Sequence, residues 1–257
     1  MNSLVRDVIA FIPGRIGSKG IAKKNLQTIG NSSLIKRSWQ HANILFPSMR
    51  RILSVDSEDL AKEAGISEKI WRQIKLGEIA EVSSGDFLHK RESEKAKDKS
   101  LIGETLIDLE NQLELLGIYF THILMLQPTT PFRNRSESLK LFEFAENLPE
   151  SLFSVTSLGP LDSSRIYKTN GKILVALEEN LIISTKPRQE LSELYIRDGG
   201  YYLISRENCR IGKPIGINPS YITREFPYNI NIDAPKDLEL ARVVYESAIY
   251  RKDFELE

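Results

Sequence analysis

Short apolar runs alternate with amphipathic segments along most of the chain. The run at residues 8–12 is continuous and ends at Pro13 and Gly14, which is typical of a strand buried on both faces of a parallel sheet. Comparable runs predict strands at residues 51–55, 122–126, 152–157, 200–205 and 228–232. Apolar residues at steps of three and four predict helices over residues 33–46, 102–116 and 136–147, a short helix at 60–64, and a last helix from Pro235. This order predicts a doubly wound, Rossmann-like mixed α/β sheet, whose ligands bind beyond the carboxyl ends of the strands.

Two regions depart from that order. Residues 66–100 are charged and have no sustained period, so we expect a surface excursion with one short strand near Phe87 and Leu88. Residues 159–197 hold hairpin-like pieces on either side of Asn170-Gly171, a strong turn signal. We therefore predict a core of residues 1–158 and 198–257 with an insert of residues 159–197. The insert cannot bury its own apolar residues, so we expect a homodimer formed through them: Ile166, Ile173, Leu174, Leu181, Ile182 and Ile183.

Composition and charge narrow the function classes. Apolar residues make up 41% and charged residues 27% of the 257 residues, an ordinary balance for a globular protein. The net charge of zero argues against a general nucleic-acid binder, which needs a basic excess to release phosphate counterions. A single cysteine excludes an internal disulfide and a cysteine-rich zinc site. No apolar run approaches the roughly 18 residues that span a bilayer, and the N-terminus lacks a signal-peptide pattern, so we expect a cytoplasmic protein without membrane association.

The loop after the first strand is the main functional clue. Glycines let backbone amides approach an anion closely, and basic side chains supply positive charge, so this composition suits a triphosphate, although an ordinary basic turn has the same composition. The spacing matches neither the Walker A pattern nor G-x-G-x-x-G. The loop contains Gly14, Gly17, Gly20, Arg15, Lys19, Lys23 and Lys24.

The order of residues in this loop resembles the signature of the acylneuraminate cytidylyltransferases. Residues 12–25 read I-P-G-R-I-G-S-K-G-I-A-K-K-N, against A-R-x-x-S-K-G-[IL]-P-x-K-N in that family, with Gly14 and Ala22 as departures. Further segments follow in the family's order: S-V-D at 54–56, R-E-S-E with Asp98 at 91–98, L-Q-P-T-T-P-F-R at 126–133, P-R-Q-E-L at 187–191 with D-G-G-Y-Y at 198–202, and N-I-N-I-D at 229–233. One such motif is weak evidence, but six in order over nearly the whole chain are specific. The resemblance implies a fold of the nucleotide-diphospho-sugar transferase type.

The resemblance also implies which residues bind the nucleotide. Asn25 would lie at the ribose, and Arg91 would lie against the cytosine or the ribose. The CTP phosphates would be held by Arg15, Ser18, Lys19 and Lys24. Three of these four, Arg15, Lys19 and Lys24, would also act in catalysis.

For the second substrate and the metal, the resemblance points to later motifs. The sugar acid would contact Gln127, Arg165, Arg188 and Tyr202. Mg²⁺ would be held by Asp233, with Asn231 in the place of the family's first aspartate, where an amide oxygen can ligate the ion but brings no charge. Asp233 also precedes Ala234-Pro235 and could instead cap the last helix. The family is an intertwined homodimer whose insert reaches the partner's site.

The implied activity is transfer of CMP from CTP to a nonulosonic, sialic-type acid. The anomeric hydroxyl of the acid attacks the α-phosphate, and pyrophosphate leaves. Such a transfer depends on positioning and charge neutralisation, which basic side chains and one hard cation provide. The motifs identify no general base. The alternatives are transfer to legionaminate, pseudaminate or an octulosonate, or a catalytically silent nucleotide-binding homologue, which Asn231 and an isoleucine at the family's arginine position, Ile196, would favour.

Overall fold

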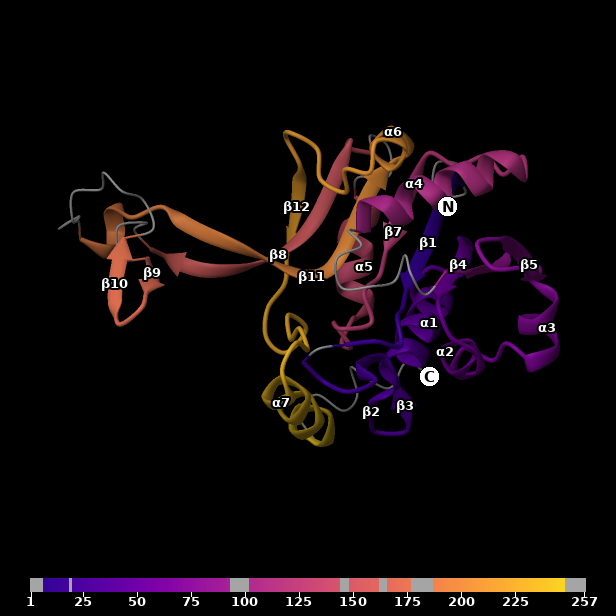
Figure 1. Cartoon of the computed structure of the whole chain (residues 1–257). Helices are drawn as coiled ribbons and strands as arrows, with labels where there is room; N and C mark the ends of the chain where they lie inside the picture. Colours follow the sequence, from indigo (N-terminus) through magenta and orange to yellow (C-terminus); the bar gives the residue numbers. More distant parts are fainter. Residues whose placement is uncertain are drawn as a thin grey trace.

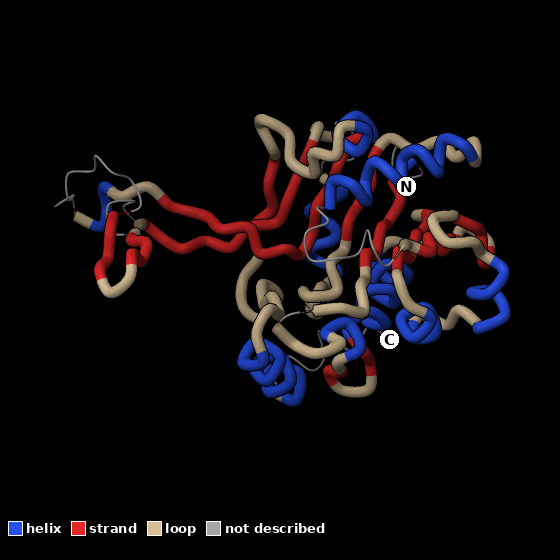
Figure 2. The backbone as a smooth tube through the Cα atoms, in the orientation of Figure 1, coloured by secondary structure: helices blue, strands red, loops and turns tan. Residues whose placement is uncertain are grey.

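The computed structural model describes residues 7–18, 20–92, 102–143, 148–161, 166–176 and 187–247, which form one large sheet with helices on both faces and a long arm at one side (Figures 1 and 2). The strand order is β12-β8-β11-β7-β1-β4-β6-β5. The parallel centre consists of β1 (Val8–Pro13), β4 (Arg50–Val55), β6 (Asp86–Lys90) and β7 (His122–Met125). Antiparallel neighbours are β11 (Glu193–Ser205) between β7 and β8 (Ser151–Pro160), and β5 (Ile79–Ser83) beside β6, while β12 (Ser220–Thr223) pairs in parallel with β8. The predicted mixed, doubly wound fold is confirmed.

Alternate residues of β1 face two separate hydrophobic layers. Val8, Ala10 and Ile12 pack on the side of α1 (Leu34–Leu45), α2 (Glu58–Glu63), α3 (Glu68–Gln73) and α5 (Arg135–Phe142). Ile9 and Phe11 pack on the side of α4 (Ile102–Leu115) and α6 (Arg206–Arg210). All five side chains are buried, as the continuous apolar run predicts. A third cluster lies under α7 (Pro235–Glu246).

Local signals fix where the helices begin and end. The hydroxyl of Ser33 accepts a hydrogen bond from the Lys36 amide at 3.3 Å and caps α1, and Ser57 and Ser67 cap α2 and α3 in the same way. Gly117, just past α4, has a φ of 66°, a left-handed conformation that glycine adopts without steric cost. The helices predicted at residues 33–46 and 102–116 are confirmed, and α5 occupies the described part of the helix predicted at 136–147.

The arm is a two-stranded ribbon made by the outer parts of β8 and β11. Their pairing continues from Val155 and Arg197 outward to Pro160 and Glu193. Beyond that pair lies the hairpin of β9 (Tyr167–Asn170) and β10 (Ile173–Ala176), whose turn contains a glycine with a φ of 62°. The hairpin predicted around Asn170-Gly171 is confirmed. The predicted insert boundaries fall inside β8 and β11, so the arm continues two core strands.

Two sequence predictions are wrong. The short strand predicted near Phe87 and Leu88 is confirmed as β6, but the surface excursion around it is wrong. Residues 66–92 form α3 and the β5–β6 hairpin, because β6 pairs with β4 and buries Phe87 and Leu88 in the main sheet. Residues 228–232 are a loop rather than a strand. Ile230 and Ile232 are buried because they pack under α7, not because they join a sheet. The strand β12, which no apolar run predicted, lies at the edge of the sheet instead.

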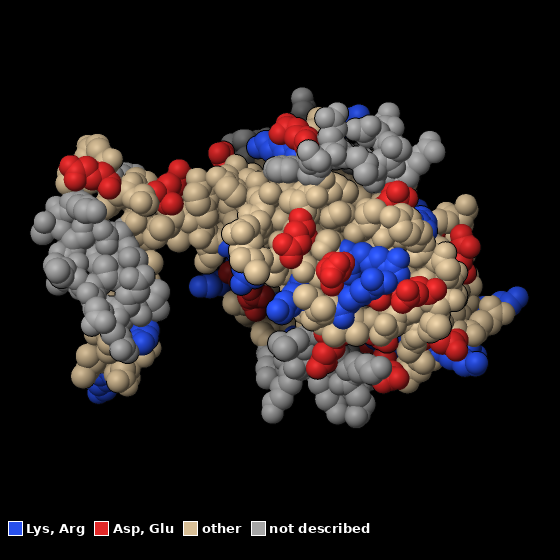
Figure 3. All heavy atoms as spheres, turned by 90° about the horizontal axis from the view of Figure 1, so that it is seen from above, with Lys and Arg blue, Asp and Glu red and all other residues tan. Residues whose placement is uncertain are grey.

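The surface of the core carries charges of both signs. Figure 3 looks onto the face that α4 and α6 cover, where basic and acidic side chains are interspersed. On these two helices the carboxylate of Glu110 accepts from Arg206 Nε at 2.7 Å and from Arg210 Nε at 3.0 Å. Among the described residues, no helix is both long enough and apolar enough to cross a membrane.

Candidate functional site

The loop after β1 is held in shape by contacts to its own backbone. The Gly14 amide donates to the Ser54 carbonyl at 2.8 Å, and the Ile16 amide donates to Asp56 Oδ1 at 2.8 Å. Asn25 is buried, and its side-chain amide donates to the Arg15 carbonyl at 2.8 Å. The loop is therefore anchored to the end of β4 on one side and to the short 3₁₀ turn Lys24–Leu26 on the other. This pre-organised shape suits an anion site, since the loop requires little reordering when a ligand binds.

The packing around Gly14 explains why glycine stands here in place of the family's alanine. A Cβ at this position would lie 2.8 Å from Ile35 Cδ1 and 3.3 Å from a methyl group of Val55. Any side chain here would push the loop away from α1 and β4, so the position requires a very small residue. Glycine brings no Cβ to this contact, whereas the family's alanine would require the Ile35 side chain to shift.

Arg91 joins the nucleotide loop from the end of β6. Its guanidinium donates to the Gly14 carbonyl, while its Nε is buried without a hydrogen-bond partner among the described residues. Burial lowers the pKa of Arg91, with Asp56 opposing and the nearby Arg15 reinforcing that shift. Two neighbouring arginines and one carboxylate leave this end of the sheet with excess positive charge, which a bound anion would neutralise.

The predicted metal residues lie next to the same loop. A Cβ at Gly20 would overlap the Asp233 carbonyl oxygen, so the loop packs directly on the segment that carries Asn231 and Asp233. Lys24 Nζ donates to Asp233 Oδ1 at 2.9 Å and to the Ile232 carbonyl at 2.9 Å. The side-chain amide of Asn231 donates to Asp233 Oδ2 at 3.2 Å. The structure thus brings together Lys24, Asn231 and Asp233, as the motifs predict.

Asp233 is not the cap of the last helix. Asp237, in the first turn of α7, accepts from the Asp233 amide at 3.0 Å and from the Ala234 amide at 2.8 Å. These backbone hydrogen bonds lower the pKa of Asp237. The carboxylate of Asp233 itself is 71% exposed and points to Lys24. The alternative interpretation of Asp233 as a helix cap is therefore wrong.

A weak magnesium site fits these residues. Within the described ranges, no group of three His, Cys, Asp or Glu residues could hold a metal. Asp233 offers one exposed carboxylate, and Asn231 Oδ1 is a buried oxygen without a hydrogen-bond partner among the described residues. Mg²⁺ keeps several waters and accepts one or two protein oxygens together with phosphate oxygens, so this donor set suits a cation that arrives with a triphosphate.

The Gln127 loop lies beside this segment. The Ile232 amide donates to the Thr129 carbonyl at 2.8 Å, which ties the Asp233 segment to the loop after β7. A Cβ at Gly199 would lie 3.0 Å from Gln127 Oε1 and 3.8 Å from Asn231 Nδ2. Gln127, Asn231 and the Gly199 turn therefore meet at the same edge of the sheet as the basic loop.

A buried charged network supports this edge, and the sequence motifs did not indicate it. Arg133 and Arg224 are both fully buried. Arg133 donates to the Gln127 carbonyl at 2.9 Å and to the Gly200 carbonyl at 3.0 Å. Arg224 donates to Glu137 Oε1 at 3.0 Å and lies 3.5 Å from Asp198 Oδ1. The network fixes the two loops that carry Gln127 and Gly199. Arg133 ends a recognised motif, but nothing in the sequence marks Arg224.

Of the remaining predicted residues, Tyr202 lies apart from this centre, Ser18 belongs to the basic loop, and two lie outside the described ranges. Tyr202 is half-buried on β11, its ring 6.5 Å from that of Phe153, and burial raises its pKa. Ser18 is half-buried in the loop. Lys19 and Arg165 lie outside the described residues, and of Arg188 only the backbone is described.

The segment with Arg188 lies on the arm. Its 3₁₀ turn, Arg188–Glu190, comes beyond the Pro160–Glu193 pair, on the side away from the core (Figures 1 and 2). The arm projects away from the core sheet (Figure 1). The structure therefore does not bring Arg188 and Gln127 together within one chain.

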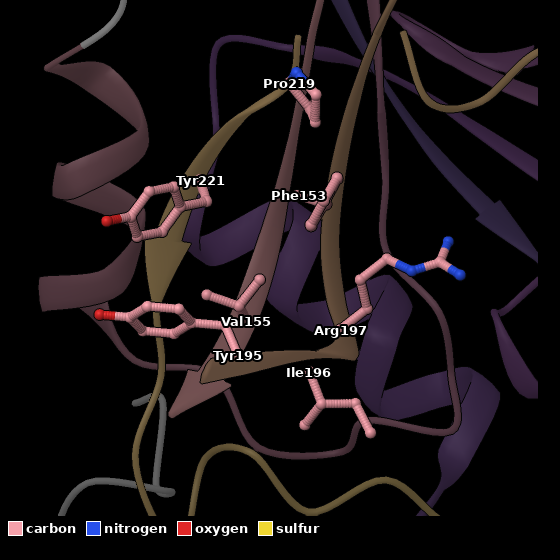
Figure 4. Close-up of a pocket in the computed structure, with 7 residues that line it drawn as sticks. All are labelled: Phe153, Val155, Tyr195, Ile196, Arg197, Pro219 and Tyr221. Atoms are coloured by element: carbon pink, nitrogen blue, oxygen red, sulfur yellow. The ribbon is translucent and has the colours of Figure 1, made fainter. Parts of the chain in front are cut away.

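A hollow of about 440 Å³ lies at the base of the arm (Figure 4). The rings of Tyr195 and Tyr221 lie side by side on one wall, 5.4 Å apart, and Arg197 extends from the other wall with its guanidinium 6.0 Å from the Phe153 ring. Ile196, at the family's arginine position, also lines this hollow. It lies near the Gly199 turn along β11, and so adjoins the edge that carries Gln127.

Solved structures of other proteins share the fold of this chain. No protein-family model matches the chain. The solved structure of a CMP:2-keto-3-deoxy-manno-octonic acid synthetase complexed with CTP superimposes with a TM-score of 0.59 over 92% of this chain and 97% of that one, at 12% identity. A 4-diphosphocytidyl-2C-methyl-D-erythritol synthase superimposes with a TM-score of 0.56 over 93% and 97%, at 17% identity. The chain therefore shares the α/β fold of these two proteins.

Sequence relatives narrow the class to a family. A CMP-N,N'-diacetyllegionaminic acid synthase of Legionella pneumophila is 25% identical over 93% of this chain and 96% of its own. A pseudaminic acid cytidylyltransferase of Campylobacter jejuni is 24% identical over 93% and 96%. An N-acylneuraminate cytidylyltransferase of Escherichia coli is 27% identical over 74% of this chain and 47% of its own. With the six ordered motifs, these relatives support the resemblance of the chain to the nonulosonate cytidylyltransferases.

Proposed function

We propose that this protein is a cytidylyltransferase that transfers CMP from CTP to a nonulosonic acid and releases pyrophosphate. The observation that carries the proposal is the meeting of three motifs at one sheet edge. The basic loop packs on the Asp233 segment, and that segment is hydrogen bonded to the Gln127 loop. In doubly wound folds this edge is where ligands bind.

The side chains at this edge suit a triphosphate. Arg15 and Lys24, with Lys19 and Ser18 of the same loop, would hold the phosphates. Arg91, whose Nε has no hydrogen-bond partner among the described residues, would supply a further donor. Asn25 holds the loop in shape by its hydrogen bond to the Arg15 carbonyl. Its proposed role at the ribose would therefore be to position the loop beside the ribose. A Mg²⁺ held by Asp233 and Asn231 would supply charge neutralisation at the phosphates. Phosphoryl transfer needs positioning and neutralisation above all, and this set of residues provides both.

The acid would lie on the Gln127 side of the edge. Gln127 follows β7, and Tyr202 lies on the neighbouring strand β11. The hollow with Arg197 lies farther along β11 toward the arm. A guanidinium beside aromatic rings suits an acid that carries both a carboxylate and acyl groups. The candidate acids are N-acetylneuraminate, legionaminate and pseudaminate. The test is pyrophosphate release from CTP with each acid. Release with one of them and none without acid supports the proposal. No release with any acid would favour the alternative, a silent homologue, which the amide at Asn231 and the apolar Ile196 suggest.

The protein would act as a homodimer in which each arm completes the partner's site. Arg188 is carried away from its own chain's Gln127, and the exposed apolar residues of the arm include Leu158, Ile173 and Leu174. Light scattering at micromolar concentration should give twice 29.3 kDa. A monomer at that concentration would reject the dimer.

A complementation experiment tests the shared site. Lys24→Ala disables the core, and Arg188→Ala disables the arm, so each variant alone should be nearly inactive. After subunit exchange, each mixed dimer would hold one site with an intact core and an intact arm, so about a quarter of wild-type turnover should return. Mixtures without any recovery would show that arm and core act within one chain.

A further inference from the structure

Both oxygens of the Asp233 carboxylate are already engaged by donors of this chain. Lys24 Nζ occupies Oδ1 at 2.9 Å, and Asn231 Nδ2 occupies Oδ2 at 3.2 Å. Lys24 is well defined there, because its ammonium also donates to the Ile232 carbonyl at 2.9 Å and its side chain is only 14% exposed. Among the residues that the structure describes at this edge, Asp233 has the exposed carboxylate, and its charge is balanced by Lys24 of the same chain.

Neighbouring carboxylates offer no substitute. Asp237 is committed to the amides of Asp233 and Ala234 and would have to release the start of α7 to bind elsewhere. Asp56 is committed to the Ile16 amide in the basic loop. A divalent cation that approaches the free chain thus meets an ammonium group at the very carboxylate it needs, and like charges at this distance repel.

We propose that Lys24 is the counter-ion of Asp233 in the free enzyme and that it leaves this carboxylate for the triphosphate when CTP and its cation bind. The inference rests on the proposed function, since it assumes CTP as the ligand. It gives Lys24 two opposite effects. In the free enzyme its ammonium opposes cation binding, whereas in the complex it supports nucleotide binding. A residue with a merely structural role would not change the two affinities in opposite directions.

The test separates these two effects with Mn²⁺ as the probe. Mn²⁺ titration of the full-length chain without nucleotide, followed by electron paramagnetic resonance, measures the cation affinity independently of any turnover. Lys24→Met should tighten Mn²⁺ binding by about tenfold, because it frees Oδ1 and removes a like charge. The same variant should weaken CTP binding in calorimetry. Lys24→Gln provides a second neutral variant, and circular dichroism checks that each variant is folded.

Three controls connect the effect to the ion pair. Lys23→Met removes a charge from the adjacent exposed lysine and should leave Mn²⁺ affinity within about twofold of wild type. Lys24→Arg keeps the charge and should bind Mn²⁺ as weakly as wild type. Lys24→Met combined with Asp233→Asn should lose the gain, because the gain is made at this carboxylate.

The outcomes distinguish this inference from the proposed function. If Lys24→Met binds Mn²⁺ no more tightly than Lys23→Met does, Lys24 does not oppose cation binding at Asp233. The inference is then overturned, whatever the enzyme's activity. If Mn²⁺ binding tightens while no acid supports pyrophosphate release, the ion pair is confirmed and the proposed function fails by itself.

Discussion

The buried charged network behind the Gln127 loop should dominate the response of this fold to substitution. Arg224 is fully buried, and its two carboxylate neighbours, Glu137 and Asp198, are 6% and 2% exposed. With Arg133 the network holds two positive and two negative side chains. Glu137→Gln preserves the shape and keeps an oxygen for Arg224, but it removes one negative charge and leaves a net positive charge in the interior. Breaking a buried pair in this way costs about 3 to 5 kcal/mol, and the retained hydrogen bond places the expected loss near 3 kcal/mol.

Urea unfolding followed by the fluorescence of Trp39 and Trp71 measures that loss. For a chain of this length, about 3 kcal/mol corresponds to a decrease of about 6 to 12 °C in Tm. The matched control is Glu58→Gln, which breaks the exposed Glu58–Lys62 pair on α2 and should cost less than about 0.5 kcal/mol. A loss for Glu137→Gln equal to that of the control would refute the electrostatic argument.

A second pair of variants tests the same reasoning from the opposite direction. Glu137→Leu alone leaves Arg224 without its main partner. Adding Arg224→Met removes the excess charge and leaves Arg133 balanced by Asp198. The double variant should therefore be more stable than Glu137→Leu alone, because an apolar pair avoids the uncompensated charge.

Three further outcomes follow from the structure. Burial, together with three nearby arginines, holds the pKa of His41 well below its usual value, so the unfolded chain takes up a proton before the native chain does as pH falls below about 6.5. Stability should thus decrease below that pH by up to about 1.4 kcal/mol per unit, and urea titrations of His41→Asn should show a flatter slope. Lys24→Ala should weaken CTP binding in calorimetry by at least about tenfold, or about 1.4 kcal/mol, while Lys23→Ala stays near wild type. Asp56→Ala should weaken it by about fivefold through loss of the Ile16 contact, whereas Asp56→Asn keeps an acceptor and most of the affinity.

The sequence predicted the centre of the fold better than its edges. Strands such as β1 are buried on both faces, so a continuous apolar run identifies them without knowledge of their neighbours. The edge strands β5 and β12 have one exposed face and mixed composition, and only their pairing partners define them. Residues 228–232 were wrongly predicted as a strand from their apolar pattern. They form a loop, and Ile230 and Ile232 are buried by packing under α7.

The sequence predicted those residues of the candidate site that belong to short contiguous motifs. Lys24, Asn231 and Asp233 lie far apart in the sequence but meet in the structure, as the order of motifs implied. Arg224 could not be predicted, because a lone arginine outside the motifs carries no local signal. Its partners, Glu137 and Asp198, come from separate elements that only the folded chain brings together.

Gly200 shows how closely the site depends on this unpredicted network. A Cβ at Gly200 would overlap the guanidinium of Arg224, and that guanidinium cannot retreat because it also donates to the Phe132 carbonyl at 2.6 Å. The neighbouring Gly199, with a φ of 80°, turns β11 against Gln127. The two positions of the motif thus require glycine for different physical reasons. One makes room for a buried arginine behind the site, and the other allows the backbone turn in front of it. Because Arg133 donates to the carbonyls of both loops, stability and substrate positioning at this edge rest on the same buried charges.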